Sequence, residues 1–324
     1  MAEMFITRLY RKRAQIIPRA RKAIMTLTRQ LPGWALEAKT PHFGKLFPNG
    51  VRVKKIATGF QFTEGPIWSP EGNFLLFSDI PANKILQVTV DGRVRIFRQP
   101  SGNSNGLTRD QEGRLIACEH SNRRVTRTEK NGSLTVLVDS FQGKRLNSPN
   151  DVVVKRDGSI YFTDPPYGIQ PIQQVQPIQG VYRLSPNGRD LKVVVHDFDR
   201  PNGLAFSPDE RKLYVADSSS RRHIRVFDVR ADSTLGNSRV FYDMNIDEPG
   251  VPDGMKIDER GHLFCTGPRG IWVFDPDGRH LGTILIPEQP ANCAWGDKDF
   301  RSLYVTARTS VYMIRVNVPG KKTL

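Results

Sequence analysis

Residues 213–217 read Leu-Tyr-Val-Ala-Asp, a short apolar stretch that ends in a small residue and a carboxylate. Similar stretches occur five more times, and the last residues of the six are 40, 45, 53, 50 and 40 positions apart. The other five are Leu-Leu-Phe-Ser-Asp (75–79), Leu-Ile-Ala-Cys-Glu (115–119), Ile-Tyr-Phe-Thr-Asp (160–164), Leu-Phe-Cys-Thr-Gly (263–267) and Leu-Tyr-Val-Thr-Ala (303–307). This period matches that of four-stranded propeller blades. The sequence therefore predicts an all-β chain, a six-bladed β-propeller.

Turn signals divide each repeat into antiparallel strands. Asn-Gly and Asp-Gly pairs, such as Asp91-Gly92 and Asp277-Gly278, favour the backbone angles of tight hairpins. The sixth repeat is incomplete, because only residues 317–324 follow its third strand. Residues 51–56 alternate between apolar and polar side chains, as a strand does. We expect this strand to complete the sixth blade, close the ring and cover an exposed edge.

The extent of the repeats and of the closing strand predicts three parts of the chain: a basic extension over residues 1–50, a propeller over 51–318 and a tail over 319–324. Residues 1–55 contribute +11 of the net charge of +15, so the rest of the chain is nearly balanced and no nucleic-acid partner is expected. Apolar residues recur at roughly helical spacing between Phe5 and Leu31. Such a basic amphipathic helix could contact an anionic membrane through residues 1–30. A solvated or partly disordered leader is the simpler interpretation, and we favour it.

The chain has three cysteines, Cys118, Cys265 and Cys293, far apart in the sequence. An odd number at such spacing does not form a disulfide framework, so we expect small buried side chains. That usage suits a reducing compartment. The sequence contains no run of about 18 apolar residues, so it predicts no membrane-spanning helix. We therefore expect a cytoplasmic protein, with peripheral membrane contact as the alternative.

A polar residue stands 14 or 15 positions before the end of each aligned strand, where the innermost strand of each blade begins. The six are Glu64, Asn105, Asn150, Asn202, Asp253 and Asn292. Six-fold equivalence would point all six side chains into the central channel at one level. Asn and Asp before Gly are also ordinary turn formers, but that does not explain Glu64 or the Asn residues that no Gly follows.

Oxygen donors without clustered His or Cys select a hard cation, so calcium fits better than zinc, with Mg²⁺ and Mn²⁺ as further candidates. Glu64 and Asp253 would balance the charge of one divalent ion. Because four side chains fall short of the six to eight oxygens that calcium prefers, water or substrate would complete the site.

These motifs resemble the gluconolactonase/regucalcin (senescence marker protein) family of six-bladed propellers, from about residue 60 to residue 316. The matching stretches are Thr63–Pro66, Asp79–Lys84, Pro149–Asp151, Pro201–Leu204 and Val251–Met255. The resemblance implies that Glu64, Asn202 and Asp253 bind the metal, with Asn150 as a fourth ligand or a substrate contact. It also implies that Asp253 is the residue nearest to a general base. Regucalcin-like members carry an Arg where this chain has Ser148, which leaves the preferred lactone open.

Two further polar residues, His120 and Asn105, are candidates for substrate contact. His120 follows the second aligned strand and could shuttle protons or bind substrate, although a structural role is equally compatible with its position. Asn105 could contact substrate or act as a cap. Gly102-Asn103-Ser104-Asn105-Gly106 matches the G-x-S-x-G motif of serine hydrolases. That motif needs a strand-turn-helix context, and a propeller strand is expected here, so we attribute the match to chance.

The prediction is a metal-dependent lactonase, a carboxylic ester hydrolase acting on a sugar or aldonic lactone. The ion would polarise the carbonyl, and Asp253 would orient or deprotonate water. One alternative is hydrolysis of another lactone or an organophosphate ester at the same site. The other is a binding scaffold without enzymatic activity, because a fold alone does not fix function.

Overall fold

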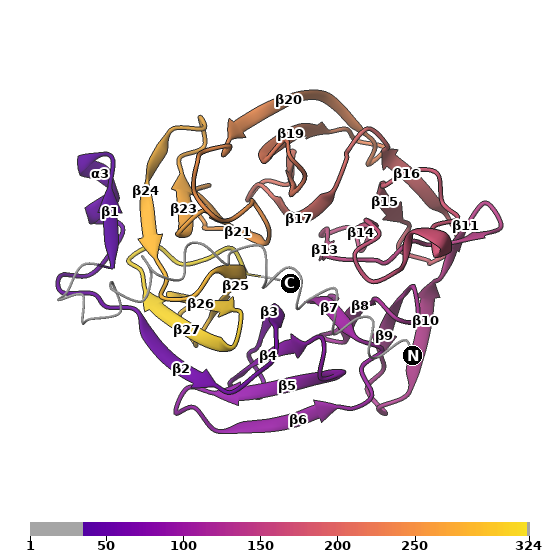
Figure 1. Ribbon diagram of the computed structural model, residues 1–324, viewed down its shortest axis with the longest axis horizontal. Coiled ribbons are helices and arrows are strands. Elements are labelled where there is room, and N and C mark those ends of the chain that lie inside the picture. The colour runs from indigo at the N-terminus through magenta and orange to yellow at the C-terminus, as the bar shows by residue number, and fades with distance from the viewer. Residues whose placement is uncertain (1–34, 323–324) are drawn as a thin grey trace.

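The computed structural model describes residues 35–322, and the predicted helix and membrane contact of residues 1–30 lie outside them. Six antiparallel sheets, five of four strands and one of five within the described residues, surround a central axis (Figure 1). Blade one is β3 (Thr63–Ser69), β4 (Phe74–Asp79), β5 (Lys84–Thr89) and β6 (Val94–Arg98); blade two is β7 (Ser104–Arg109), β8 (Leu115–Glu119), β9 (Arg124–Thr128) and β10 (Leu134–Val138); blade three is β13 (Val152–Val154), β14 (Ile160–Thr163), β15 (Val181–Leu184) and β16 (Leu191–Val195).

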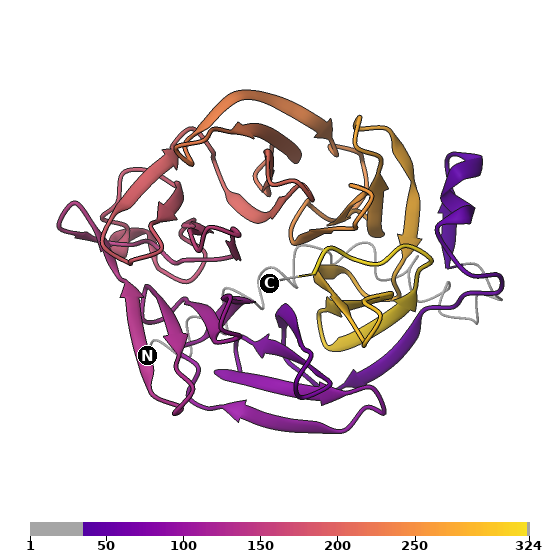
Figure 2. The same ribbon diagram turned by 180° about the vertical axis from the view of Figure 1, so that it is seen from behind.

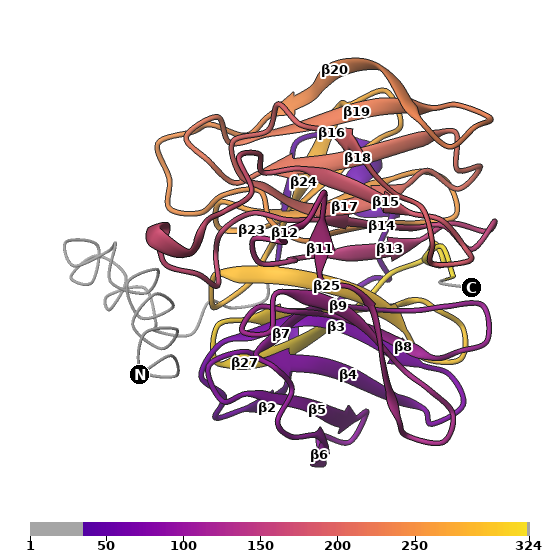
Figure 3. The ribbon, with the colours of Figure 1, turned by 90° about the vertical axis from the view of Figure 1, so that its right-hand side faces the viewer.

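The second half of the ring repeats this order. Blade four is β17 (Pro201–Phe206), β18 (Lys212–Asp217), β19 (His223–Val229) and β20 (Leu235–Asp243); blade five is β21 (Met255–Ile257), β22 (Leu263–Gly267), β23 (Gly270–Phe274) and β24 (His280–Leu285); blade six is β25 (Pro290–Gly296), β26 (Ser302–Ala307), β27 (Ser310–Arg315) and β2 (Lys54–Thr58). Seen from the side, the outer strands β6 and β20 lie at opposite ends of the molecule (Figure 3). The predicted six-bladed propeller is confirmed.

Strand β2 closes the ring, as the sequence analysis predicted. It pairs antiparallel with β27, with Lys54 opposite Met313 and Thr58 opposite Ser310. The strand begins three residues later than predicted, and Val51 and Val53 instead pack against the core. Hairpin turns also follow the prediction, since Gly92 and Gly278 adopt φ values of 84° and 92°.

Residues 36–47, assigned to the extension by the sequence analysis, lie against blade five. Strand β1 (Leu36–Ala38) pairs with β24 as a fifth strand of that sheet, and helix α3 (Pro41–Lys45) follows it at the rim of the ring (Figure 2). The Phe43 side chain is completely buried and meets Phe47 edge to face, with ring centroids 5.1 Å apart. The part of the chain that packs on the propeller therefore begins well before residue 51.

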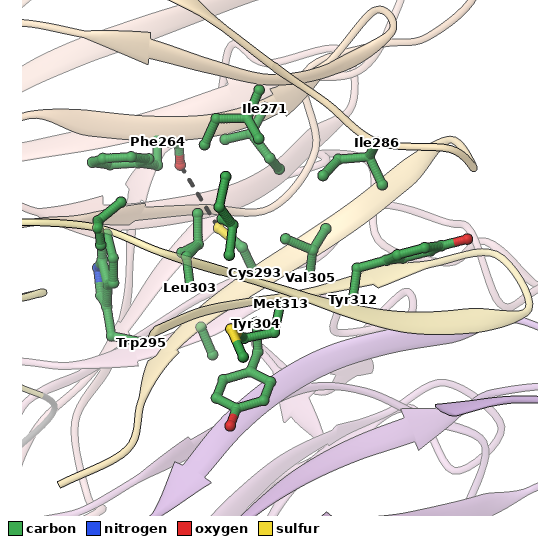
Figure 4. Packing of buried hydrophobic residues seen from close by; sticks show 14 of the residues in the cluster. Phe264, Ile271, Ile286, Cys293, Trp295, Leu303, Tyr304, Val305, Tyr312 and Met313 are labelled. Carbon is green, nitrogen blue, oxygen red and sulfur yellow. Dashed lines mark hydrogen bonds between the residues drawn. The ribbon is translucent and has the colours of Figure 1, made fainter. Parts of the chain in front are cut away.

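The core lies between neighbouring sheets. Between blades five and six, Phe264 packs edge to face against Trp295, with ring centroids 4.9 Å apart, and the Cys293 thiol points toward the Phe264 carbonyl oxygen (Figure 4). All three cysteines are buried and free, as expected of small apolar side chains. This packing fixes the spacing of the inner strands, which carry the polar ring.

A few short elements complete the fold. The two-stranded ribbon β11 (Ser140–Phe141) and β12 (Lys144–Arg145) precedes blade three, and the 3₁₀ turn η1 (Pro171–Gln173) lies in the loop between β14 and β15. No helix within residues 35–322 is long and apolar enough to cross a membrane.

Candidate active site

The six polar residues predicted to form a ring lie at the start of the innermost strands. Glu64, Asn105, Asn202 and Asn292 belong to β3, β7, β17 and β25, and Asn150 and Asp253 precede β13 and β21 by two residues. All six are buried, none more than 7% exposed. Four of the inner strands are bulged at or beside this level, between Glu64 and Ile67 in β3, for example. A bulge redirects a side chain locally, which lets these strands present a polar group to the channel.

Close packing of neighbouring inner strands explains why glycine follows most of these residues. A Cβ on Gly65 would lie 1.9 Å from the Asn105 carbonyl oxygen, and a Cβ on Gly203 would lie 2.3 Å from the Asp253 carbonyl oxygen. Asn105-Gly106 and Asn202-Gly203 lie inside strands, so the turn-forming interpretation of these pairs does not apply. These glycines allow four of the six blades to approach the next blade closely beside the ring residues.

Hydrogen bonds connect adjacent members of the ring. Asn105 Nδ2 donates to Asn150 Oδ1 at 2.6 Å, and Asn150 Nδ2 donates to Asn202 Oδ1 at 2.5 Å. Asn202 Nδ2 donates to Ser218 Oγ at 2.9 Å, and that hydroxyl donates to the carbonyl oxygen of Pro252, the residue before Asp253. The amide oxygens of Asn150 and Asn202 therefore have fixed positions in the channel.

The two carboxylates of the ring repel one another. Burial raises the pKa of Glu64 well above its ordinary value, and the charges of Asp253 and then Asp151 raise it further. The Gly65 N–H donates to Glu64 Oε2 at 2.7 Å and opposes that shift. A bound cation would relieve this repulsion, because opposite charge favours the ionised carboxylate.

Glu64, Asp253, Asn150 and Asn202 offer buried, hard oxygen donors, and this donor set fits a calcium-type ion. Within residues 35–322 no three His, Cys, Asp or Glu side chains cluster as a metal site, so the amide oxygens are needed to complete the predicted set. Asn292 has a different orientation, since its Oδ1 accepts from the Cys293 N–H at 2.9 Å.

His120 lies beside the ring and is completely buried. Asn105 Nδ2 is 3.3 Å from His120 Nε2, so this amide contacts both the imidazole and Asn150. Ser148 is also buried, and its hydroxyl accepts from the Gly168 N–H at 2.8 Å, which anchors the loop between β14 and β15. Ser148 thus holds the loop at Gly168, which also lies against the His120 side chain.

Ser104 lies within a strand and not at a strand-turn-helix junction. Its hydroxyl is buried and lies 2.8 Å from the hydroxyl of Ser78. A nucleophilic serine needs an adjacent base, and Ser78 is not one. The structural context required by the G-x-S-x-G motif is absent at this position.

Carboxylates at the ends of aligned strands hold the ring in position. Asp79 accepts from the backbone N–H groups of Gln61 and Phe62, just before Glu64. Asp164 likewise accepts from the N–H groups of Asn147 and Ser148, before Asn150, each at 2.7 Å. The same offset from strand end to ring residue recurs in the sequence, but the bonds themselves could not be derived from it.

Two residues of the channel were missed by sequence analysis, Asp151 and Lys256. Both follow ring residues along the inner strands, and Asp151 replaces the glycine found in other repeats. That replacement was the available signal for Asp151. Nothing in the sequence indicated that either side chain would reach Asn292 of blade six.

Known proteins resemble this chain over most of its length. Residues 62–309 match the model of the SMP-30/Gluconolactonase/LRE-like region. The chain belongs to this family. It is similar to a gluconolactonase of Zymomonas mobilis, with 36% identity over 92% of this chain and 94% of that protein. The family prediction is confirmed.

Solved structures of the family share the fold. A gluconolactonase from Xanthomonas campestris superposes with a TM-score of 0.80 and 34% identity, covering 87% of this chain and 94% of its own. A calcium-binding regucalcin from Agrobacterium tumefaciens superposes with a TM-score of 0.65 over 82% of this chain and 96% of its own, at 17% identity. At that identity the second likeness concerns the fold alone.

Proposed function

We propose that this chain hydrolyses a sugar lactone at the channel mouth, with one divalent ion held by Glu64, Asn150, Asn202 and Asp253. The lactonase activity, a carboxylic ester hydrolysis, is supported by the gluconolactonase relatives that match nearly the whole chain. The observation that carries the metal dependence is the pair of buried, mutually repelling carboxylates among fixed amide oxygens. Calcium is the ion that this oxygen donor set suits best.

Each group of the site has a role in this proposal. The ion, when bound, supplies Lewis-acid polarisation of the lactone carbonyl. Asp253 orients the attacking water and accepts its proton, since a carboxylate within reach of water acts as a general base. Asn105 and His120, which contact one another, bind the hydroxyls or ring oxygen of the sugar and hold them over the ring. Asn150 contributes through its fixed Oδ1.

The test is hydrolysis of gluconolactone by wild type after chelation and after return of calcium, with spontaneous hydrolysis subtracted. We expect activity to vanish with chelator and to return with the ion. Glu64→Gln should weaken both activity and the rise in melting temperature that calcium gives, because a ligand of the folded state stabilises by mass action. The control is Glu112→Gln, which also converts Glu to Gln but at an exposed side chain, and it should behave as wild type.

Two results would contradict the proposal. Full activity in chelator would exclude the metal. A chain that binds calcium but hydrolyses none of a panel of sugar lactones would favour the binding scaffold.

A further inference from the structure

A third carboxylate lies in the channel beside the ring. Asp151 is 3% exposed, and its Oδ2 accepts from Asn292 Nδ2 at 3.3 Å. Asp151 precedes β13 of blade three, whereas Asn292 belongs to β25 of blade six, on the opposite side of the ring (Figure 1). The contact therefore spans the channel. Asp151 also acts on Glu64, because its charge contributes to the raised pKa of that group.

Lys256 contacts the same amide. Its Nζ donates to Met255 O at 3.0 Å and lies 3.5 Å from Asn292 Oδ1. Burial raises the pKa of Asp151, and the Lys256 charge is the largest influence that opposes this rise. The Asn292 side chain thus links two charged groups: its Oδ1 faces the Lys256 ammonium and its Nδ2 donates to the Asp151 carboxylate.

The surroundings of Lys256 restrict the screening of its charge. Lys256 lines a pocket of about 70 Å³ with apolar residues that include Leu107, Val152 and Trp295, and the charged residues Glu210, Lys321 and Lys322 also line it. Charges within such surroundings interact more strongly than charges on an exposed surface. Lys256 can therefore influence groups that it does not touch.

Around the ring and Asn292, Glu64, Asp253 and Asp151 together carry three negative charges when ionised, and Lys256 carries one positive charge. Of the other charged residues that line the Lys256 pocket, Lys321 pairs with Glu210 at 3.2 Å and Lys322 is exposed. We propose that Lys256 is the fixed counter-charge of Asp151, leaving the channel a net charge of −2 that matches one divalent ion. The inference rests on the proposed metal site, and it assigns Lys256 a positioning role that sets affinity for the ion without contacting it.

The experiment measures calcium affinity by isothermal titration calorimetry at pH 8. Lys256→Met removes the positive charge and should tighten calcium binding by roughly tenfold, the effect of one charge change at intermediate dielectric. Asp151→Asn should weaken binding by roughly tenfold for the same reason. The double variant should return to within about threefold of wild type, because its net channel charge is again −2.

Two controls separate charge from structure. Lys256→Arg keeps the charge and should bind calcium within about threefold of wild type. Lys130→Met removes an exposed lysine and should leave affinity unchanged. A merely structural lysine would not tighten binding on removal. Unchanged or weaker binding in Lys256→Met, with wild type binding normally, would overturn this inference and leave the metal site intact.

A second measurement needs no ion. In chelator, Lys256→Met leaves a buried carboxylate without its counter-charge and should lower the melting temperature, and adding Asp151→Asn should restore at least half of the loss. Failure of that restoration would refute the pairing of Lys256 with Asp151. If wild type binds no divalent ion, the proposed function and the role in metal affinity both fail, while this measurement still decides whether the two charges compensate.

Discussion

Asp253→Asn and Ser104→Ala together distinguish a metal-assisted reaction from a serine nucleophile. Asp253→Asn preserves side-chain shape but removes one of two charges on the proposed ligands and the proposed proton acceptor. Loss of a general base typically costs on the order of 10²–10⁴ in rate. That corresponds to about 3–5 kcal/mol of transition-state stabilisation at 1.36 kcal/mol per tenfold.

The expected effect of Ser104→Ala is on stability. The Ser104 hydroxyl lies 2.8 Å from that of Ser78, which also donates to the Asn105 carbonyl oxygen at 2.8 Å. Ser78 therefore keeps a partner after the substitution, and the loss should be about 1 kcal/mol of unfolding free energy, the net value of one hydrogen bond. The rate should remain within about twofold of wild type.

The assay is initial-rate lactone hydrolysis at saturating calcium, so that reduced metal affinity is not mistaken for reduced chemistry. Unfolding in urea provides the stability of both variants. An inactive Ser104→Ala with a normal unfolding curve, beside an Asp253→Asn that turns over at nearly the wild-type rate, would exclude the metal-assisted reaction in favour of a serine nucleophile.

Two further predictions concern the scaffold. Phe43→Ala should lower the unfolding free energy by about 3–5 kcal/mol, measured by urea titration, because Phe43 is completely buried. The control Phe97→Ala, at a side chain that is 41% exposed, should cost about 1 kcal/mol or less in the same titration. Equal losses in the two variants would mean that residues 36–47 do not pack as described. Burial raises the pKa of Asp164 from 3.8 to about 7, so the folded chain keeps a proton that the unfolded chain releases. This contribution to stability is fully present below about pH 4 and is lost as pH rises through 7. Asp164→Asn should therefore flatten the plot of melting temperature against pH between these values. An unchanged slope in the variant would contradict this role of Asp164.

Much of the fold could be predicted because propeller blades repeat. The aligned strands fix the register, and an offset of 14 or 15 positions from their ends then places Glu64 and Asp253 at or just before the start of inner strands. Strand β1 and helix α3 were missed because residues 36–45 carry no repeat signal, and their burial depends on the face of blade five that receives Phe43.

The interior of the site was predicted less completely. Ring equivalence relates a residue to its counterparts in the other blades, but it does not describe contacts across the channel. Asn292 lies near the start of the inner strand of blade six, as predicted, yet its orientation toward Asp151 and Lys256 depends on the width of the channel. The sequence analysis offered only turn formation as a reason for a glycine after a ring residue, whereas Gly203 avoids a steric clash with the next blade.

The pairing of β2 with β27 has a consequence for how the chain folds. Thr58 and Ser310 share a hydrogen bond although they are 252 positions apart in the sequence. Contacts of such high sequence separation slow folding, because the entropy of closing a long loop is lost before the contact forms. During synthesis, blades one to five can form before β27, the last strand and the partner of β2, has been made. Until then the chain carries an unpaired strand edge, and we expect its folding intermediates to be prone to aggregation at this point.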